Sequence, residues 1–218
     1  MVRRLAIVAA LALPTSHALA EGHGHAVGLK AGALGLGLEY SYQFNPRLSV
    51  RGGVNGASVG TDLDEAGIRY DVDVVWDSLT VGVDFHPTQR AFRLSAGALL
   101  SNDNRLEALS RPTQNVMVGD TTYTPAQVGT LIAVASFDGS APFLGLGWDW
   151  SRDKRVGMTL DLGLVDQGDP KVTLVGTGTL LGNQAFQSDI AAERADLEQE
   201  LEDFGLAPYA SIGLMIRF

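Results

Sequence analysis

Charged residues recur at one fixed position in four separate stretches of the sequence. Each stretch has seven residues, with a charge at the sixth position and an aromatic residue at the seventh. The four charges are Glu39, Asp84, Asp149 and Arg217. Charged side chains that share one enclosed space can line a path for ions, or they can pair with one another and close that space.

Three further charges lie in the segments that follow these stretches. They are Arg51, Arg93 and Asp161, and the alternation of side chains turns them to the same side as the first four. Because an unpaired buried charge is costly, opposite charges in a narrow interior are expected to form ion pairs. The sequence is compatible with two interpretations of these seven residues: a structural plug of ion pairs, and an ion path lined by fixed charges.

The four stretches alternate with the period of a β-strand. They are Leu34–Tyr40, Leu79–Phe85, Leu144–Trp150 and Ile212–Phe218, and their first, third, fifth and seventh positions are apolar. The opposite side carries glycine, threonine, methionine and the charge. Apolar residues on one side and small or polar residues on the other are typical of a strand whose apolar side faces lipid.

Short polar turns connect three of these stretches to a second alternating segment, which begins near Leu48, Ala91 or Val156. Short turns at one rim and long excursions at the other are typical of bacterial barrels, with the short turns in the periplasm. One more strand, at residues 23–30 with a turn near residues 31–33, brings the count to eight. The predicted fold class is therefore all-β: an eight-stranded antiparallel up-and-down transmembrane β-barrel with long extracellular extensions.

The remaining residues are expected above the membrane in three segments, 56–70, 101–141 and 166–207. Two stretches within them, Val128–Ala135 and Val172–Val175, resemble strands. They either extend the barrel wall or form an extra hairpin, which would give ten strands.

Residues 186–204 predict an acidic helix before the last strand. Apolar residues recur there with helical spacing, Ser188 is a suitable N-cap, and Gly205 signals the C-terminal end. Seven carboxylates and one arginine make the other face of this helix strongly acidic.

Aromatic residues gather at the expected periplasmic ends of the strands. Rings with one apolar and one polar side suit a membrane interface, so an aromatic girdle is the predicted role and ligand stacking the alternative. The residues are Tyr40, Tyr42, Phe44, Phe85, Trp148, Trp150 and Phe218.

The N-terminus indicates export. Two arginines precede a short apolar stretch and Ala18–Ala20, which predicts a signal peptide over residues 1–20 and a single barrel domain over residues 21–218. Without the two arginines, 14 basic residues face 25 acidic ones, which changes the net charge from -9 to -11. This charge argues against a nucleic-acid partner, and the absence of cysteine excludes thiol chemistry.

The sequence predicts no defined metal site, no cofactor and no enzymatic activity. His23 and His25 are too few for a strong metal site, and His86 falls in a periplasmic turn, away from the outer rim where a histidine base would be needed. Carboxylates in the external segments could bind divalent cations that bridge lipopolysaccharide, or they form a solvated acidic face. They are Asp62, Asp64, Glu65, Asp71, Asp73, Asp120, Asp138, Asp166 and Asp169.

With its signal peptide, repeated hairpins and terminal Ser211–Phe218, the chain resembles the small outer-membrane β-barrels of Gram-negative bacteria, the OmpA/OmpX/OmpW and opacity-protein group. The resemblance implies an outer-membrane location, contact with the lipid bilayer and lipopolysaccharide, and recognition of the C-terminal strand by the barrel-assembly machinery. It implies a non-enzymatic structural or surface-interaction role, or alternatively a narrow porin-like channel for small, preferably cationic solutes. The acidic helix departs from the pattern of that group.

Overall fold

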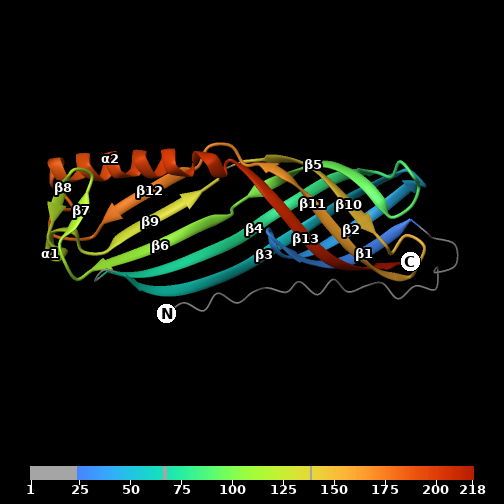
Figure 1. The fold of residues 1–218 in the computed structure, drawn as a ribbon, viewed down its shortest axis with the longest axis horizontal. Coiled ribbons are helices and arrows are strands. Elements are labelled where there is room, and N and C mark those ends of the chain that lie inside the picture. Colours follow the sequence, from blue (N-terminus) through green and yellow to red (C-terminus); the bar gives the residue numbers. More distant parts are fainter. Residues whose placement is uncertain (1–23, 66–67, 138) are drawn as a thin grey trace.

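A computed structural model describes residues 24–65, 68–137 and 139–218, and its main element is one antiparallel sheet that closes into a barrel (Figure 1). The predicted signal peptide and His23 lie outside the described residues. None of the helices in the described ranges has the length and apolar character needed to cross a membrane.

Eight strands form the closed barrel in the described part of the chain. Their order around the wall is β1, β2, β3, β4, β5, β10, β11 and β13, and β13 pairs with β1 to close it. The eight-stranded fold class is thus confirmed. The barrel strands are β1 (His25–Gly32), β2 (Gly35–Asn45), β3 (Leu48–Glu65), β4 (Ile68–Phe85), β5 (Phe92–Asn102), β10 (Ala141–Asp149), β11 (Val156–Asp166) and β13 (Leu206–Arg217).

Two strands are much longer than the sequence indicated. β3 and β4 have 18 residues each and pair along their whole length, from Leu48 opposite Phe85 to Glu65 opposite Ile68. Residues 56–70 were expected as an external segment, and the structure shows that most of this segment is strand, because β3 and β4 continue beyond the barrel wall. The first hairpin also turns slightly later than expected, with β1 continuing to Gly32, which pairs with Gly35.

Above the barrel, the sheet continues as an open extension of β3 and β4. The lower half of β4 pairs with β5 and its upper half with β6 (Arg105–Pro112), followed by β9 (Leu131–Ser136) and β12 (Lys171–Gly176). Asn104 lies at the step between β5 and β6, where its Oδ1 accepts a hydrogen bond of 2.9 Å from the backbone N–H of Asp77. The two strand-like stretches therefore extend the wall and do not produce a ten-stranded barrel.

The polarity of β4 reverses between barrel and extension. Within the barrel its outward side is apolar: Leu79, Val81 and Val83 are between 39% and 46% exposed. Above Ser78 the apolar residues change to the inner side, at Val72, Val74 and Trp76. The outer side of that part carries aspartates and Arg69. The exposed apolar side of the barrel part would suit lipid and the reversed part suits water, and the change between the two falls near residue 78.

The helix α2 (Gln184–Leu201) covers part of the extension and leads into the short 3-10 helix η1 (Glu202–Phe204) (Figure 1). Its N-cap is Asn183, whose Oδ1 accepts a hydrogen bond of 3.1 Å from the backbone N–H of Phe186. The prediction of Ser188 as N-cap is wrong, because Ser188 lies inside the helix and donates to the carbonyl of Gln184.

A small apolar core holds α2 against the extension. Side chains also come from the hairpin of β7 (Val116–Val118) and β8 (Thr121–Tyr123) and from the helix α1 (Pro125–Val128). Carboxylates of α2 contribute, since Glu193 Oε2 accepts 3.0 Å from Gly119 N and Glu198 Oε1 accepts 3.1 Å from Val172 N. The buried residues of this core are Val118, Tyr123, Val128, Phe186 and Ile190.

We expect Tyr123→Phe to weaken the contact between the β7–β8 hairpin and α2. The Tyr123 hydroxyl donates a hydrogen bond of 2.5 Å to Asp189 Oδ2, and this bond lowers the pKa of Asp189. Since the folded-state pKa lies below the unfolded value, the stabilisation is present at neutral pH and is lost as the pH falls through the usual range of an aspartate. NMR titration of the variant should show the pKa of Asp189 raised toward its ordinary value.

Tyr70→Phe provides the control for this titration, because Tyr70 lies on β4 and is not among the groups that shift the pKa of Asp189. It should leave the titration of Asp189 unchanged. An unaltered Asp189 titration in Tyr123→Phe would show that the hydrogen bond does not stabilise the carboxylate.

Candidate functional site in the barrel interior

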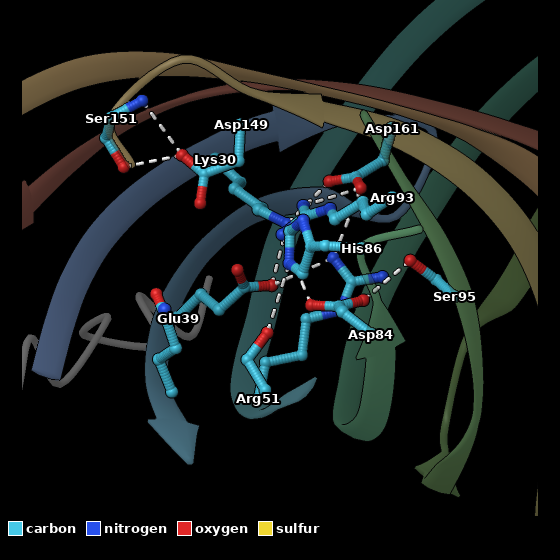
Figure 2. A network of polar contacts seen from close by, with 12 residues as sticks. Lys30, Glu39, Arg51, Asp84, His86, Arg93, Ser95, Asp149, Ser151 and Asp161 are labelled. Carbon is cyan, nitrogen blue, oxygen red and sulfur yellow. Dashed lines mark hydrogen bonds and ion pairs between the residues drawn. The ribbon is translucent and has the colours of Figure 1, made fainter. Parts of the chain in front are cut away.

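Asp161, on β11, is the centre of a buried network of charges inside the barrel (Figure 2). Its Oδ2 lies 2.7 Å from Lys30 Nζ, and its Oδ1 lies 2.7 Å from Arg93 Nη2 and 3.2 Å from Arg51 Nη1. One carboxylate thus contacts three cations. All of these cations come from other strands, β1, β3 and β5.

Glu39 and Asp84 provide the other negative charges of this network. Glu39 Oε2 lies 2.7 Å from Lys30 Nζ and 3.5 Å from Arg51 Nη1. Asp84 is completely buried and contacts Arg51 Nε at 3.4 Å and Arg93 Nη1 at 3.2 Å. Three cations therefore face three anions, and the six side chains, which we call the central network, carry no net charge.

The central network crosses the interior of the barrel. β3 and β11 are four positions apart around the eight-stranded wall, so they lie on opposite sides. The contact between Arg51 and Asp161 therefore spans the lumen. Eight-stranded barrels have an interior just wide enough for side chains to fill, and here charged side chains from opposite walls meet.

Asp149 and Arg217 form a separate ion pair. Arg217 Nη2 lies 2.5 Å from Asp149 Oδ2, while the backbone N–H of Ser151 donates to Asp149 Oδ1 at 2.9 Å. Arg217 Nη1 also donates to Gln43 Oε1 at 3.4 Å. The sequence indicated one level for these residues together with Glu39 and Asp84. The structure instead divides the seven predicted residues between the central network and this pair.

Lys30 is a member of the central network that the sequence prediction missed. It lies on β1 and alternates with Leu29, which is 64% exposed on the outer side. The same alternation that turned the other charges inward applies to Lys30, so the signal was present in the sequence.

An apolar layer lies above the central network, on the side of the extension. Phe143 and Tyr209 meet edge to face, with ring centroids 5.8 Å apart, and pack with Leu99, Ala141 and Val165. There is no room for a side chain at Gly97, where an added Cβ would lie 2.6 Å from Phe143. Glycine at this position therefore lets the phenylalanine ring enter the barrel.

Between the central network and the apolar layer is a small polar cavity of about 50 Å³. Glu39 and Tyr209 line it, and both Glu39 Oε1 and Tyr209 Oη are buried without a hydrogen-bond partner among the described residues. A cavity of this size and polarity accommodates a few water molecules, which would satisfy such atoms.

Comparison with solved structures finds this architecture in proteins of Acinetobacter baumannii. The crystal structure of CarO matches with a TM-score of 0.60 at 22% identity, covering 89% of this chain and 97% of CarO. CarO2 matches with the same TM-score at 18% identity, covering 89% and 98%. The chain has the fold of the small Gram-negative outer-membrane β-barrels. At these identities the comparison shows the fold and does not show an activity.

Three other comparisons add little to this result. Ail of Yersinia pestis aligns over 89% of this chain and 94% of its own, at 14% identity and a TM-score of 0.38. No protein-family model and no curated protein matches the sequence.

Aromatic residues surround the barrel end that is opposite to the extension. Tyr40, Phe85, Trp150 and Phe218 are between 40% and 47% exposed there. Three other residues of the predicted girdle make ring contacts: Tyr42 with Phe44 at 4.9 Å, and Trp148 with Phe92 at 5.7 Å between centroids. Their positions suit an interface, and the girdle stays a prediction.

His86 is buried in the turn after β4, beside Ser49 and the carbonyl of Arg90. Burial, together with the nearby charge of Arg152, lowers the pKa of His86 to about 4, so the ring is neutral at physiological pH. His25 Nδ1 lies 2.6 Å from Tyr40 Oη at the same end of the barrel. Both described histidines thus lie far from the extension.

The external carboxylates are spread over the outer side of the extension and its loops. Several are paired, as Asp71 is with Arg111 and Asp64 with Arg69. Asp138 and the side chain of Glu65 lie outside the described residues. Within the described ranges, no group of three or more histidine, aspartate or glutamate side chains is arranged to hold a metal ion.

Proposed function

We propose that this protein is a closed, non-enzymatic barrel of the outer membrane that holds an extracellular platform of sheet and helix. The observation that supports this most directly is the central network. Six charges from six strands, five of them buried, neutralise one another across the lumen, and the contact between Arg51 and Asp161 joins opposite walls. Such a network stabilises the barrel from within and occupies the space that a channel would need.

An outer-membrane location agrees with the exposed apolar side of the barrel strands. In this proposal the signal peptide over residues 1–20 directs export and is then removed. In this proposal the lipid bilayer and lipopolysaccharide surround the barrel, and the C-terminal strand ending in Phe218 is recognised by the barrel-assembly machinery.

The platform is the part of the protein available for surface interaction. It consists of the upper halves of β3 and β4, the strands β6, β9 and β12, and α2 with its acidic outer face. Its small apolar core and its hydrogen-bonded carboxylates give it a defined shape. A defined external surface on a closed barrel suits a structural role in the envelope or contact with a partner.

Reconstitution of the purified protein in planar bilayers tests this proposal. A closed barrel produces no ion conductance above that of the lipid. A narrow channel for small cations is the alternative, and it is less well supported because the central network has no net charge to attract cations.

A further inference from the structure

An apolar pocket of about 330 Å³ lies at the mouth of the barrel, where the extension begins. Trp76, Leu106, Ala135, Phe137, Leu201 and Phe204 contribute to its lining, and we refer to it as the mouth pocket. We propose that the mouth pocket binds a small, largely apolar molecule without a negative charge. This site goes beyond the closed-barrel proposal and does not depend on it.

The sheet register brings the apolar side chains together. Val74 of β4 pairs with Leu106 of β6, which pairs with Ala135 of β9, so the three form one row across the inner side of the extension. Trp76 belongs to the same side because it lies two residues after Val74 along β4. The reversal of polarity on β4 thus produces an apolar inner surface directly above the barrel.

The mouth pocket is only partly covered. Phe204 at the C-terminal end of the helical segment is 61% exposed and Leu106 is 39% exposed, although both contribute to the lining. Apolar side chains that line a hollow and remain exposed to water gain free energy when an apolar molecule displaces that water.

The floor of the mouth pocket separates it from the barrel interior. Leu34, Val165 and Tyr209 line both this pocket and the small polar cavity below. The Tyr209 hydroxyl is buried and has no hydrogen-bond partner within the described part of the chain, whereas its ring forms part of the apolar floor. A bound molecule would therefore rest on the apolar layer, above the central network.

Size and charge restrict the class of molecule. A cavity of about 150 Å³ holds one benzene ring, so about 330 Å³ suits a body of one or two rings or a short branched chain. Arg105 is the cation among the lining residues, and its Nε is paired with Glu107 Oε1 at 2.6 Å. Glu202 and Asp203 lie next to Phe204 in the chain. These charges favour an uncharged or cationic molecule over an anionic one.

Tryptophan fluorescence can report on this pocket alone. The chain has three tryptophans, and Trp148 and Trp150 lie at the other end of the barrel. The double variant Trp148→Phe/Trp150→Phe, held in lipid nanodiscs, leaves Trp76 as the one emitter. 2-Bromonaphthalene, a quencher that acts at contact, should quench Trp76 saturably with one site per chain. The same ring system with a sulfonate, 6-bromonaphthalene-2-sulfonate, should bind at least roughly tenfold more weakly.

Two matched substitutions on β9 test the position of the site. Ala135→Phe places a ring in the pocket and should remove the saturable quenching, whereas Val134→Phe adds the same bulk on the opposite side of the strand and should retain it. Leu106→Asn, at a half-exposed position, should weaken binding without filling the pocket. Heat-modifiable gel mobility shows that each variant is folded.

Probe that merely dissolves in lipid gives quenching that rises in proportion to its concentration. The variant Trp76→Phe, which retains Trp148 and Trp150, should show this linear behaviour. The proposal is overturned if Trp76 shows it too, if Ala135→Phe leaves saturable binding intact, or if the sulfonate binds equally well. A conductance measurement has no bearing on these outcomes, so the two proposals fail independently.

Discussion

We expect Asp161→Asn to lower the free energy of unfolding by about 3–5 kcal/mol. Asp161 contacts all three cations of the central network and is 1% exposed. The substitution keeps the shape of the side chain but leaves three buried cations facing two anions. Because a buried charge without a partner is costly, the loss should be far larger than that of a surface pair. Urea unfolding in lipid vesicles, followed by tryptophan fluorescence, measures the effect.

The matched control is Asp64→Asn, which breaks an exposed pair with Arg69. The side chains of Asp64 and Arg69 are both more than 60% exposed, so the loss in free energy of unfolding should stay below about 1 kcal/mol. The double variant Lys30→Met/Asp161→Asn removes one charge of each sign and should lose less stability than the sum of the two single variants, by about 0.5–3 kcal/mol. Additive losses would show that the six charges do not act as one network.

Phe186→Ala should destabilise the platform by about 3–5 kcal/mol and leave the barrel folded. Phe186 is completely buried, meets Tyr123 edge to face with centroids 5.0 Å apart, and packs against Gly176. Truncation leaves a cavity in a core of only a few residues. Hydrogen exchange should show loss of protection in α2, with the barrel strands unchanged.

Phe204→Ala is the control for this substitution. It removes the same ring from a position that is 61% exposed, so protection in α2 should change little. If Phe186→Ala left α2 as protected as in the parent protein, the platform would be held by something other than this core. Loss of barrel protection in the same variant would show that barrel and platform fold as one unit.

The barrel could be predicted from the sequence because its strands repeat one pattern. Alternation and short turns together fixed the number of strands and their directions. The long hairpin of β3 and β4 escaped prediction because its apolar residues change sides near Ser78. The alternation that places apolar residues on the outer side, which predicts a lipid-facing strand, ends there, although the strand itself continues. The start of α2 was misplaced for a related reason: burial of Phe186 requires a helix that begins before it, so Asn183 and not Ser188 provides the cap.

The side that each charge faces could be predicted, but its height in the barrel could not. The alternation of side chains predicted that Asp149 and Arg217 face inward, as Glu39 does. Strand tilt and stagger then decide which inward residues meet, and these depend on the closed barrel as a whole. This is why Asp149 and Arg217 pair with each other, while Glu39 pairs with Lys30 across neighbouring strands. The mouth pocket could not be predicted from the sequence either, since it forms from five strands and the end of a helix.

Conductance of the purified, folded protein in planar lipid bilayers tests the closed barrel most directly. The balanced central network predicts no conductance steps above those of the lipid, in protein whose insertion is verified by its heat-modifiable gel mobility. Reproducible cation-selective steps that change on Asp84→Asn or Asp149→Asn would contradict it, and would show that the charges inside the barrel line a path for ions.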